Sequence, residues 1–289
     1  MTLDISLARK APARTDVHAV TVTSDEVDDE PHGLDWDVLK ARGFDGSIGQ
    51  AQLVTGPNGP TVALGMGPAA DVNTIAYRRA GAAFAKAAKR SKRAAADVFG
   101  AIGDELSKAD AAQAFTEGLE LGAYEYLELK SDAKPAKLSA VVLVATGKAV
   151  TEAAARGQAI GGGVNLARDL VNEPGGSLTP AAFARRANSV AKQHKLTAKI
   201  MGMAEIKKAR MGGLLGVNRG STQQPRFVQL TYRPPGKAKG HLALVGKGIT
   251  FDAGGLSIKT GQGMMTMKCD MGGAAAVLGA MSVVATLAP

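Results

Sequence analysis

Cysteine is almost absent from this chain, which has one, Cys269, among 289 residues. A single thiol excludes an internal disulfide framework and is typical of a reducing compartment, so we expect a cytoplasmic protein. Aromatic residues are also scarce, at 4%. The core must therefore be built from small and aliphatic side chains, because Ala and Gly are abundant.

Signals for export or membrane insertion are weak. The first residues lack a basic segment followed by an apolar run, so we expect no secretory signal. Residues 271–289 contain no charged side chain, and this stretch has the minimum length for a membrane span. It consists mainly of Gly, Ala, Val and Met, with few large lipid-facing side chains. We therefore predict a core helix and no membrane partner.

Acidic residues are outnumbered, 26 against 35 basic residues, for a net charge of +9. Such an excess can indicate contact with nucleic acid. The basic residues are spread along helix-like stretches such as 76–96, without interleaved aromatics or a known reading motif. A solvated basic face is the preferred interpretation, and nucleic-acid binding stays open as an alternative.

The residue pattern predicts an α/β architecture. Strand-like runs, rich in β-branched or apolar residues, alternate with Ala-rich helical runs in the first half. The predicted strands are 19–23, 52–55, 61–65 and 138–145, and the predicted helices are 76–96 and 110–121. This organisation predicts an N-terminal α/β domain over 1–146.

An Ala-rich helix is predicted over 147–171, interrupted by Gly161-Gly162-Gly163. The triplet lacks the spacing of a dinucleotide fingerprint, so we expect a linker helix with close backbone packing at the glycines. A second α/β domain is predicted over 172–289. Thr179 before Pro180 predicts a helix start. The other predicted elements are strands over 197–201, 227–232 and 242–245 and a helix over 204–210, with the apolar run 242–245 in the middle of a mixed sheet flanked by helices.

Acidic residues nearly vanish in the last third of the chain. From residue 206 onward only Asp252 and Asp270 are acidic, among eleven lysines and arginines. Carboxylates in glycine-rich, apolar surroundings are costly to bury unless a cation compensates them. Aspartate is a normal ligand of zinc, magnesium or manganese, and a lysine amine can ligate once deprotonated. Lys247 and Lys259 lie nearby in the sequence, so one could serve a metal while the other stabilises an oxyanion.

The same segment admits other interpretations. A phosphate-binding loop is disfavoured because five residues separate Gly240 from Gly246 and a glycine follows Lys247. Structural salt bridges, Lys247 with Asp252 and Lys268 with Asp270, stay open on spacing alone. Cys269 as a nucleophile is disfavoured, because none of the histidines has a protease-like context. These histidines are His18, His32, His194 and His241.

Three runs, 245–255, 257–259 and 267–271, closely resemble the leucyl (cytosol) aminopeptidase family, and 167–174 looks like that family's linker. The resemblance implies that Lys247, Asp252 and Asp270 ligate two divalent metal ions, zinc or manganese, with Asp252 bridging them. It implies that Lys259 is catalytic and that Met267 lines the pocket for the substrate's N-terminal side chain. It disfavours the salt-bridge interpretation.

The resemblance also implies an activity. A member of the family would be a cytoplasmic metalloprotease, usually a homo-hexamer, that hydrolyses N-terminal residues from peptide substrates with a leucine-like preference by a two-metal mechanism. Its fold would be a smaller N-terminal α/β domain (1–146), the linker helix (147–171) and a larger catalytic domain (172–289).

One family signature, Asn-Thr-Asp-Ala-Glu-Gly-Arg, is absent from this sequence. It would supply an Asp and a Glu as ligands and a catalytic Arg, so the second metal site is expected to be incomplete. We expect an inactive or incomplete fragment that associates with itself. The alternative is a non-catalytic nucleic-acid-binding or regulatory protein on the same scaffold.

Overall fold

The computed structural model describes residues 3–103, 105–236 and 240–288. The chain divides into two compact units, Met1–Gly162 and Gly163–Pro289, which we call unit 1 and unit 2 and describe separately. The division falls inside helix α4 (Lys148–Asn172). A helix was predicted there over 147–171, so its position is confirmed.

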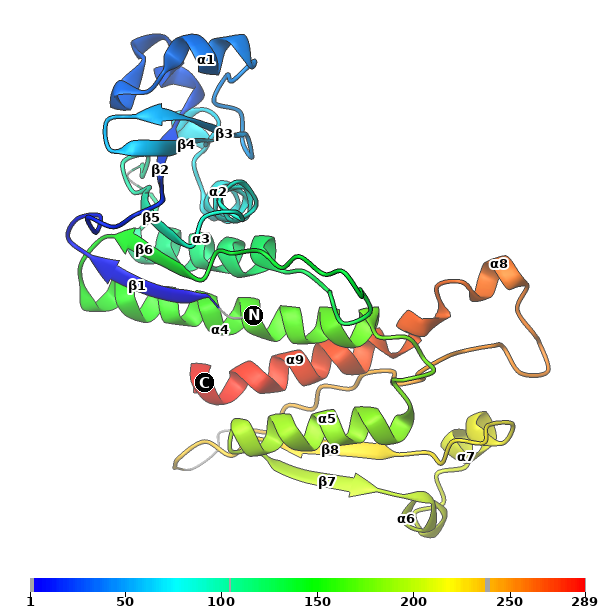
Figure 1. The fold of residues 1–289 in the computed structure, drawn as a ribbon. Coiled ribbons are helices and arrows are strands. Elements are labelled where there is room, and N and C mark those ends of the chain that lie inside the picture. Colours follow the sequence, from blue (N-terminus) through cyan, green and yellow to red (C-terminus); the bar gives the residue numbers. More distant parts are fainter. Residues whose placement is uncertain (1–2, 104, 237–239, 289) are drawn as a thin grey trace. The chain divides into compact units, whose positions relative to one another are not determined.

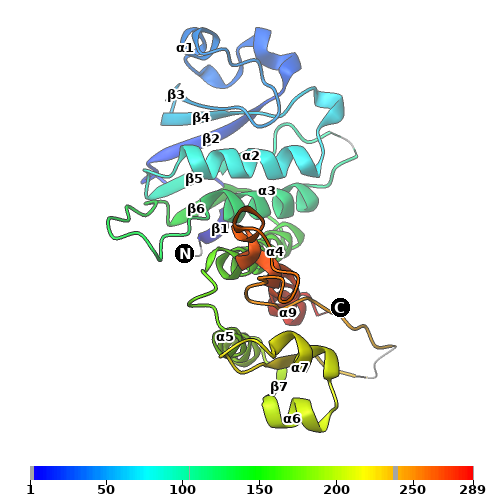
Figure 2. The same cartoon turned by 90° about the vertical axis from the view of Figure 1, so that its right-hand side faces the viewer.

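Unit 1 is built on a six-stranded sheet with the order β1-β6-β5-β2-β4-β3. Its neighbours pair in parallel except β3 and β4, which are antiparallel. Helices α2 (Thr74–Ala87) and α3 (Lys108–Ala123) lie side by side over one face of this sheet (Figures 1 and 2). The strands are β1 (Asp4–Ala8), β2 (Val17–Val22), β3 (Ala51–Gly56), β4 (Gly59–Gly65), β5 (Arg93–Asp97) and β6 (Ala140–Val144). The predicted α/β class is confirmed.

Short helices connect the strands of unit 1. They are η1 (Ser24–Asp29), η2 (Pro31–Gly33), α1 (Trp36–Ala41) and η3 (Ala69–Asp71).

The prediction of one helix over 76–96 is wrong at its C-terminal end. The helix ends at Ala87, and Arg93–Asp97 forms β5, an inner strand between β2 and β6. Alanine favours helices in isolation. Here the buried residues Ala94, Ala95 and Ala96 gain two hydrogen-bonded neighbours, and this tertiary pairing overrides the local preference. Strand β1 was not predicted.

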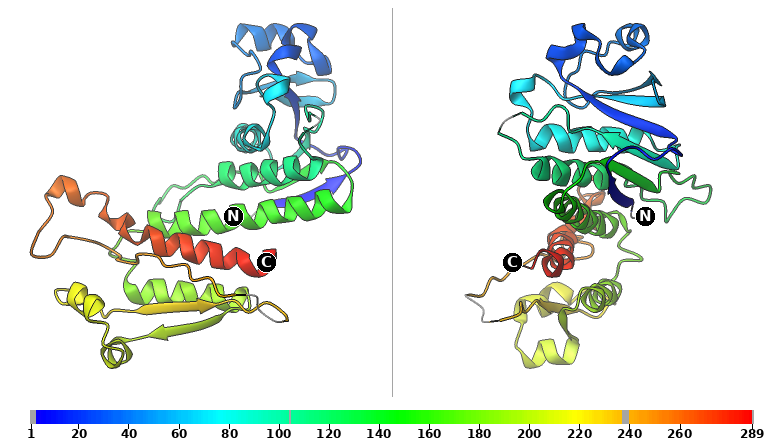
Figure 3. Two further views of the ribbon diagram at one scale, coloured as in Figure 1. Left: turned by 180° about the vertical axis from the view of Figure 1, so that it is seen from behind. Right: turned by 90° about the vertical axis from the view of Figure 1, so that its left-hand side faces the viewer.

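Unit 2 contains a two-stranded antiparallel sheet, β7 (Thr197–Met201) with β8 (Phe227–Thr231). Helix α5 (Pro180–Gln193) packs on it (Figure 3). Thr179 caps α5 as predicted, because its side chain accepts a hydrogen bond from the backbone N–H of Ala182 at 3.3 Å. The remaining elements are α6 (Met203–Lys208), α7 (Gly212–Asn218), α8 (Gly261–Met264), η4 (Met267–Met271) and α9 (Gly272–Leu287).

The predicted central strand 242–245 is wrong for this structure. These residues lie in no strand, and the side chains of Leu242 and Val245 are 88% and 93% exposed. A strand needs a hydrogen-bonded neighbour, and within the described residues β8 pairs with β7 alone. The apolar composition of 242–245 indicates that these residues need to be buried, but it does not show whether a neighbouring strand is present to pair with them.

Helix α9 buries one face, formed by Ala275, Leu278, Gly279, Ser282 and Val283. The stretch Gly261–Leu287 is long and apolar enough to cross a membrane by length and composition, and 33% of its most apolar window is buried. That stretch is not one continuous helix, because α8 and η4 precede α9. The 16 residues of α9 span about 24 Å, less than the roughly 30 Å of a hydrocarbon core. A core-facing helix is the better description.

Helix α9 packs closely against the C-terminal part of α4. A Cβ atom at Gly163 would lie 2.5 Å from Val283 Cγ2 and 2.8 Å from the carbonyl oxygen of Gly279. The predicted close backbone packing is therefore confirmed at this glycine. At the neighbouring Gly162 an added Cβ would meet nothing within 4 Å.

This contrast predicts opposite effects of one methyl group at adjacent helix positions. Gly163→Ala should destabilise the chain by about 1–3 kcal/mol through overpacking. Gly162→Ala should stabilise it by about 0.5–1 kcal/mol, because alanine loses less backbone entropy in a helix. Denaturant unfolding of both variants measures the difference. Equal effects would contradict the described contact between α4 and α9.

Candidate metal centre

Lys247 is fixed by its own backbone against the start of α9. Its carbonyl oxygen accepts the N–H of Ala274 at 2.8 Å, and the extended chain before it runs along α9 (Figures 1 and 3). A Cβ on Gly246 would collide with the backbone of Gly273. Glycine at 246 therefore permits this approach, which brings Lys247 beside η4, the turn that leads into α9.

Asp252 and Lys259 are joined by a tight glycine turn. The Asp252 carboxylate accepts the N–H of Gly254 at 2.9 Å, and the N–H of Lys259 donates to the Ala253 carbonyl at 2.9 Å. Gly254 has φ +93°, and a Cβ there would collide with the carbonyl oxygen of Ser257. A side chain at 254 would open this turn, so glycine is required to keep the two charged residues together.

All five predicted site residues lie in one cluster. Lys247 Nζ is 3.1 Å from Asp270 Oδ2 and 3.5 Å from Asp252 Oδ2. Lys259 Nζ is 3.6 Å from Asp252 Oδ2 and 3.0 Å from the sulfur of Met267. We call Lys247, Asp252, Lys259 and Asp270 the lysine–carboxylate cluster.

The cluster is electrically neutral as it stands, with two ammonium groups facing two carboxylates. The Asp270 carboxylate is the main cause of the raised pKa of Lys247, and Asp252 adds to it. The N–H of Gly254 contributes most to lowering the pKa of Asp252. The two carboxylates thus stabilise the charged form of Lys247, and the Gly254 N–H stabilises the charged form of Asp252.

The salt-bridge interpretation is half confirmed. Lys247 does pair with Asp252, as that interpretation required. Lys268 instead donates to the backbone carbonyl of Asn172 at 2.9 Å, and the ion pairs of the described residues include none between Lys268 and Asp270. Sequence reasoning missed this contact, and no spacing signal could have found it, since the partners are 96 residues apart.

One buried atom tests whether the cluster suits a cation. Asp270 Oδ2 is enclosed and has no hydrogen bond, although Lys247 Nζ lies 3.1 Å away. This contact is an ion pair without hydrogen-bond geometry, so the oxygen keeps unused lone pairs. An enclosed carboxylate in this state suits a metal ion.

The donor types also fit. Two carboxylates and one amine are hard or borderline ligands of the kind that zinc and manganese accept. No group of three or more His, Cys, Asp and Glu suited to a metal occurs among the described residues, because one donor here is a lysine. Three donors are fewer than the four that zinc or the six that manganese commonly takes. As a metal site, the cluster would therefore supply only part of a ligand set.

Two family models match the chain, and both describe domains of one peptidase family. The cytosol aminopeptidase family's N-terminal domain matches residues 15–133, and its catalytic domain matches residues 165–289. Together with the α/β fold and the lysine–carboxylate cluster, these matches place the chain in the class of α/β peptidase folds. The chain belongs to the cytosol aminopeptidase family.

Individual relatives agree. A probable cytosol aminopeptidase of Thermosynechococcus vestitus is 40% identical over 271 residues, which cover 91% of this chain and 54% of the relative. Among solved structures, a mutant of tomato leucine aminopeptidase has a TM-score of 0.84 at 30% identity, covering 100% of this chain and 60% of that one. The bottromycin maturation enzyme BotP in complex with Mn has a TM-score of 0.82 at 35% identity, covering 94% and 56%. The chain therefore spans about half the length of the relatives it matches.

The close approach of Gly246 to α9 predicts a sensitive position. Gly246→Ala should lower stability by about 1–3 kcal/mol, because the added methyl group collides with backbone and cannot be relieved by a side-chain rotation. Gly240→Ala is the matched control, since a Cβ there meets nothing within 4 Å. Chemical unfolding compares the two variants. A Gly246→Ala variant as stable as its control would disprove the described packing of Lys247.

Proposed function

We propose that this chain contributes one side of the metal site of an aminopeptidase that removes N-terminal residues, with a leucine-like preference, from peptides. The convergence of Lys247, Asp252 and Asp270, with an enclosed carboxylate oxygen left without a hydrogen bond, is the observation that carries the proposal. Membership of the cytosol aminopeptidase family and the Mn complex of BotP support it.

Lys247, Asp252 and Asp270 would hold divalent metal, zinc or manganese. Bound metal would supply Lewis-acid activation of the scissile carbonyl and of water. The Lys247 ammonium pairs with both carboxylates, and it must lose its proton before its nitrogen can ligate a metal.

Lys259 has a different role in the proposal. Its ammonium is held between the Asp252 carboxylate and the Met267 sulfur, at 3.6 and 3.0 Å. A fixed positive charge at this place can stabilise the oxyanion that develops on the substrate carbonyl. Met267 would line the pocket for the substrate's first side chain, because it lies directly beside that ammonium.

We further propose that activity requires polypeptide in addition to residues 1–289. The three donors fall short of a full coordination shell, and the chain covers 54% of its Thermosynechococcus relative. Exposed apolar side chains in the segments that lead to the cluster agree with a missing cover, since Leu242, Val245 and Ile258 are 88%, 93% and 66% exposed. On the basis of family membership we also propose a cytoplasmic location and a homo-hexameric assembly. The nucleic-acid alternative has no support from these relatives, which are named as aminopeptidases.

Hydrolysis assays on two proteins test the activity. The 289-residue chain alone should release little leucine from a chromogenic amide. The same chain fused to the remaining part of the Thermosynechococcus relative should release it in a manganese- or zinc-dependent way, because the fusion restores the missing ligands. Asp270→Asn in the fusion should reduce the rate by about 100-fold, because loss of a ligand should cost at least as much as the roughly 10–100-fold loss that follows removal of a residue orienting a ligand.

Asp132→Asn in the fusion is the matched control, because Asp132 is exposed and lies in unit 1. Robust release by the isolated chain would refute the incomplete site. A folded fusion that binds metal and releases no leucine would refute the assigned activity.

A further inference from the structure

The turn η4 (Met267–Met271) carries Asp270, and few backbone hydrogen bonds within the turn fix the position of this residue. The hydrogen bonds of a 3-10 turn have poorer geometry than those of an α-helix. Cys269 N–H donates to the Thr266 carbonyl at 2.9 Å, and the N–H of Gly272 donates to the Cys269 carbonyl. The place of the Asp270 carboxylate therefore depends on what its neighbours in the turn contact.

Lys268 makes one of these contacts. Its Nζ donates to the backbone carbonyl of Asn172, the last residue of α4, at 2.9 Å. The last carbonyls of a helix have no partner inside the helix. A lysine ammonium is favoured there both as a donor and as a positive charge at the negative end of the helix dipole. Lys268 is only partly exposed, so the contact is shielded from bulk water.

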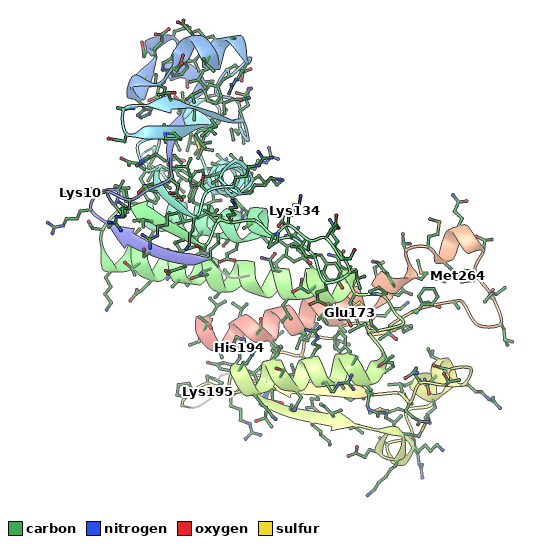
Figure 4. The ribbon with its side chains drawn as sticks, in the orientation of Figure 1. Lys10, Lys134, Glu173, His194, Lys195 and Met264 are labelled. Carbon is green, nitrogen blue, oxygen red and sulfur yellow. The ribbon has the colours of Figure 1, made fainter. Side chains whose placement is uncertain are left out.

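Met271 fixes the other side of Asp270. It is 0% exposed and belongs to a core cluster with Leu170 and Leu278. Figure 4 labels Glu173, which follows α4 directly, near the N-terminal end of α9. Asp270 thus lies between a residue bonded to the end of α4 and a residue buried in the core of unit 2.

We propose that Lys268 is a positioning residue for the metal site: its bond to the C-terminal end of α4 holds η4 so that Asp270 faces Lys247. This inference rests on the metal site proposed above. Lys268 does not act on the cluster directly, since the ion pairs and hydrogen bonds of the described residues link it to Asn172 alone.

The direction of the change in metal affinity on removal of Lys268 distinguishes a positioning role from a purely electrostatic one. A positive charge two residues from Asp270 repels a dication, so removal of Lys268 would tighten metal binding if charge were its only influence. If Lys268 holds the turn, its removal releases the Asp270 carboxylate and weakens binding. Loss of a residue that orients a ligand typically lowers metal affinity about 10–100-fold.

Calorimetric titration with Mn²⁺ and hydrogen exchange measured by mass spectrometry test the proposal on the 289-residue chain. Lys268→Met should bind Mn²⁺ about 10–100-fold more weakly than the unchanged chain. It should also exchange faster in the peptide that contains residues 267–271. Lys268→Arg keeps a donor and a charge, so it should restore both properties. Lys192→Met is the matched control, because Lys192 is an exposed lysine in the last turn of α5.

Equal or tighter Mn²⁺ binding by Lys268→Met would overturn the proposal, as would an equal loss in Lys192→Met, which would indicate general destabilisation. If the unchanged chain binds no Mn²⁺, the proposed metal site fails for this chain. The hydrogen-exchange experiment then still tests whether Lys268 holds η4 in place. An unchanged exchange rate of residues 267–271 in Lys268→Met would overturn the positioning role of Lys268. Faster exchange in Lys268→Met, with the original rate restored in Lys268→Arg, would support it.

Discussion

Asp252 and Asp270 lie close enough to share one ammonium group, and this constraint governs the geometry of the last third of the chain. Two carboxylates brought together repel each other and lose hydration, so their approach requires positive charge between them. Lys247 supplies it, and the backbone contact between its segment and the first turn of α9 sets where that charge lies. The glycines at 246 and 254 follow from this requirement, because a side chain at either position would separate the charged groups.

The same constraint connects stability with chemistry. Lys247 and Lys259 together balance the two carboxylates, so the cluster carries no net charge. A divalent ion would attract the carboxylates more strongly than an ammonium group does. Asp270 Oδ2 is enclosed and makes no hydrogen bond that a metal would have to replace. The same arrangement is therefore neutral by itself and suited to the proposed metal. The ion pairs do not argue against a metal site.

Much of this arrangement was predictable from the sequence. The resemblance of 245–255, 257–259 and 267–271 to the aminopeptidase family implied that Lys247, Asp252 and Asp270 share one site, and Thr179-Pro180 predicted the start of α5. The failures share a cause. Residues 93–97 look helical in isolation but are a strand because β2 and β6 flank them, while 242–245 look like a strand but lie unpaired. The partner of Lys268 was equally hidden, since a bond to the carbonyl of Asn172 leaves no trace in residue type or spacing. Tertiary pairing decides each case, and local composition does not contain it.

Manganese titration followed by electron paramagnetic resonance, in which bound Mn²⁺ loses the free-ion signal, tests most directly whether Lys247, Asp252 and Asp270 form the proposed metal site. The account predicts that the 289-residue chain removes the free Mn²⁺ signal and that Asp252→Asn, which alters the carboxylate placed between both lysines, removes far less at the same concentration. Identical titrations of the two proteins, or a free-ion signal that the unchanged chain leaves intact, would contradict it.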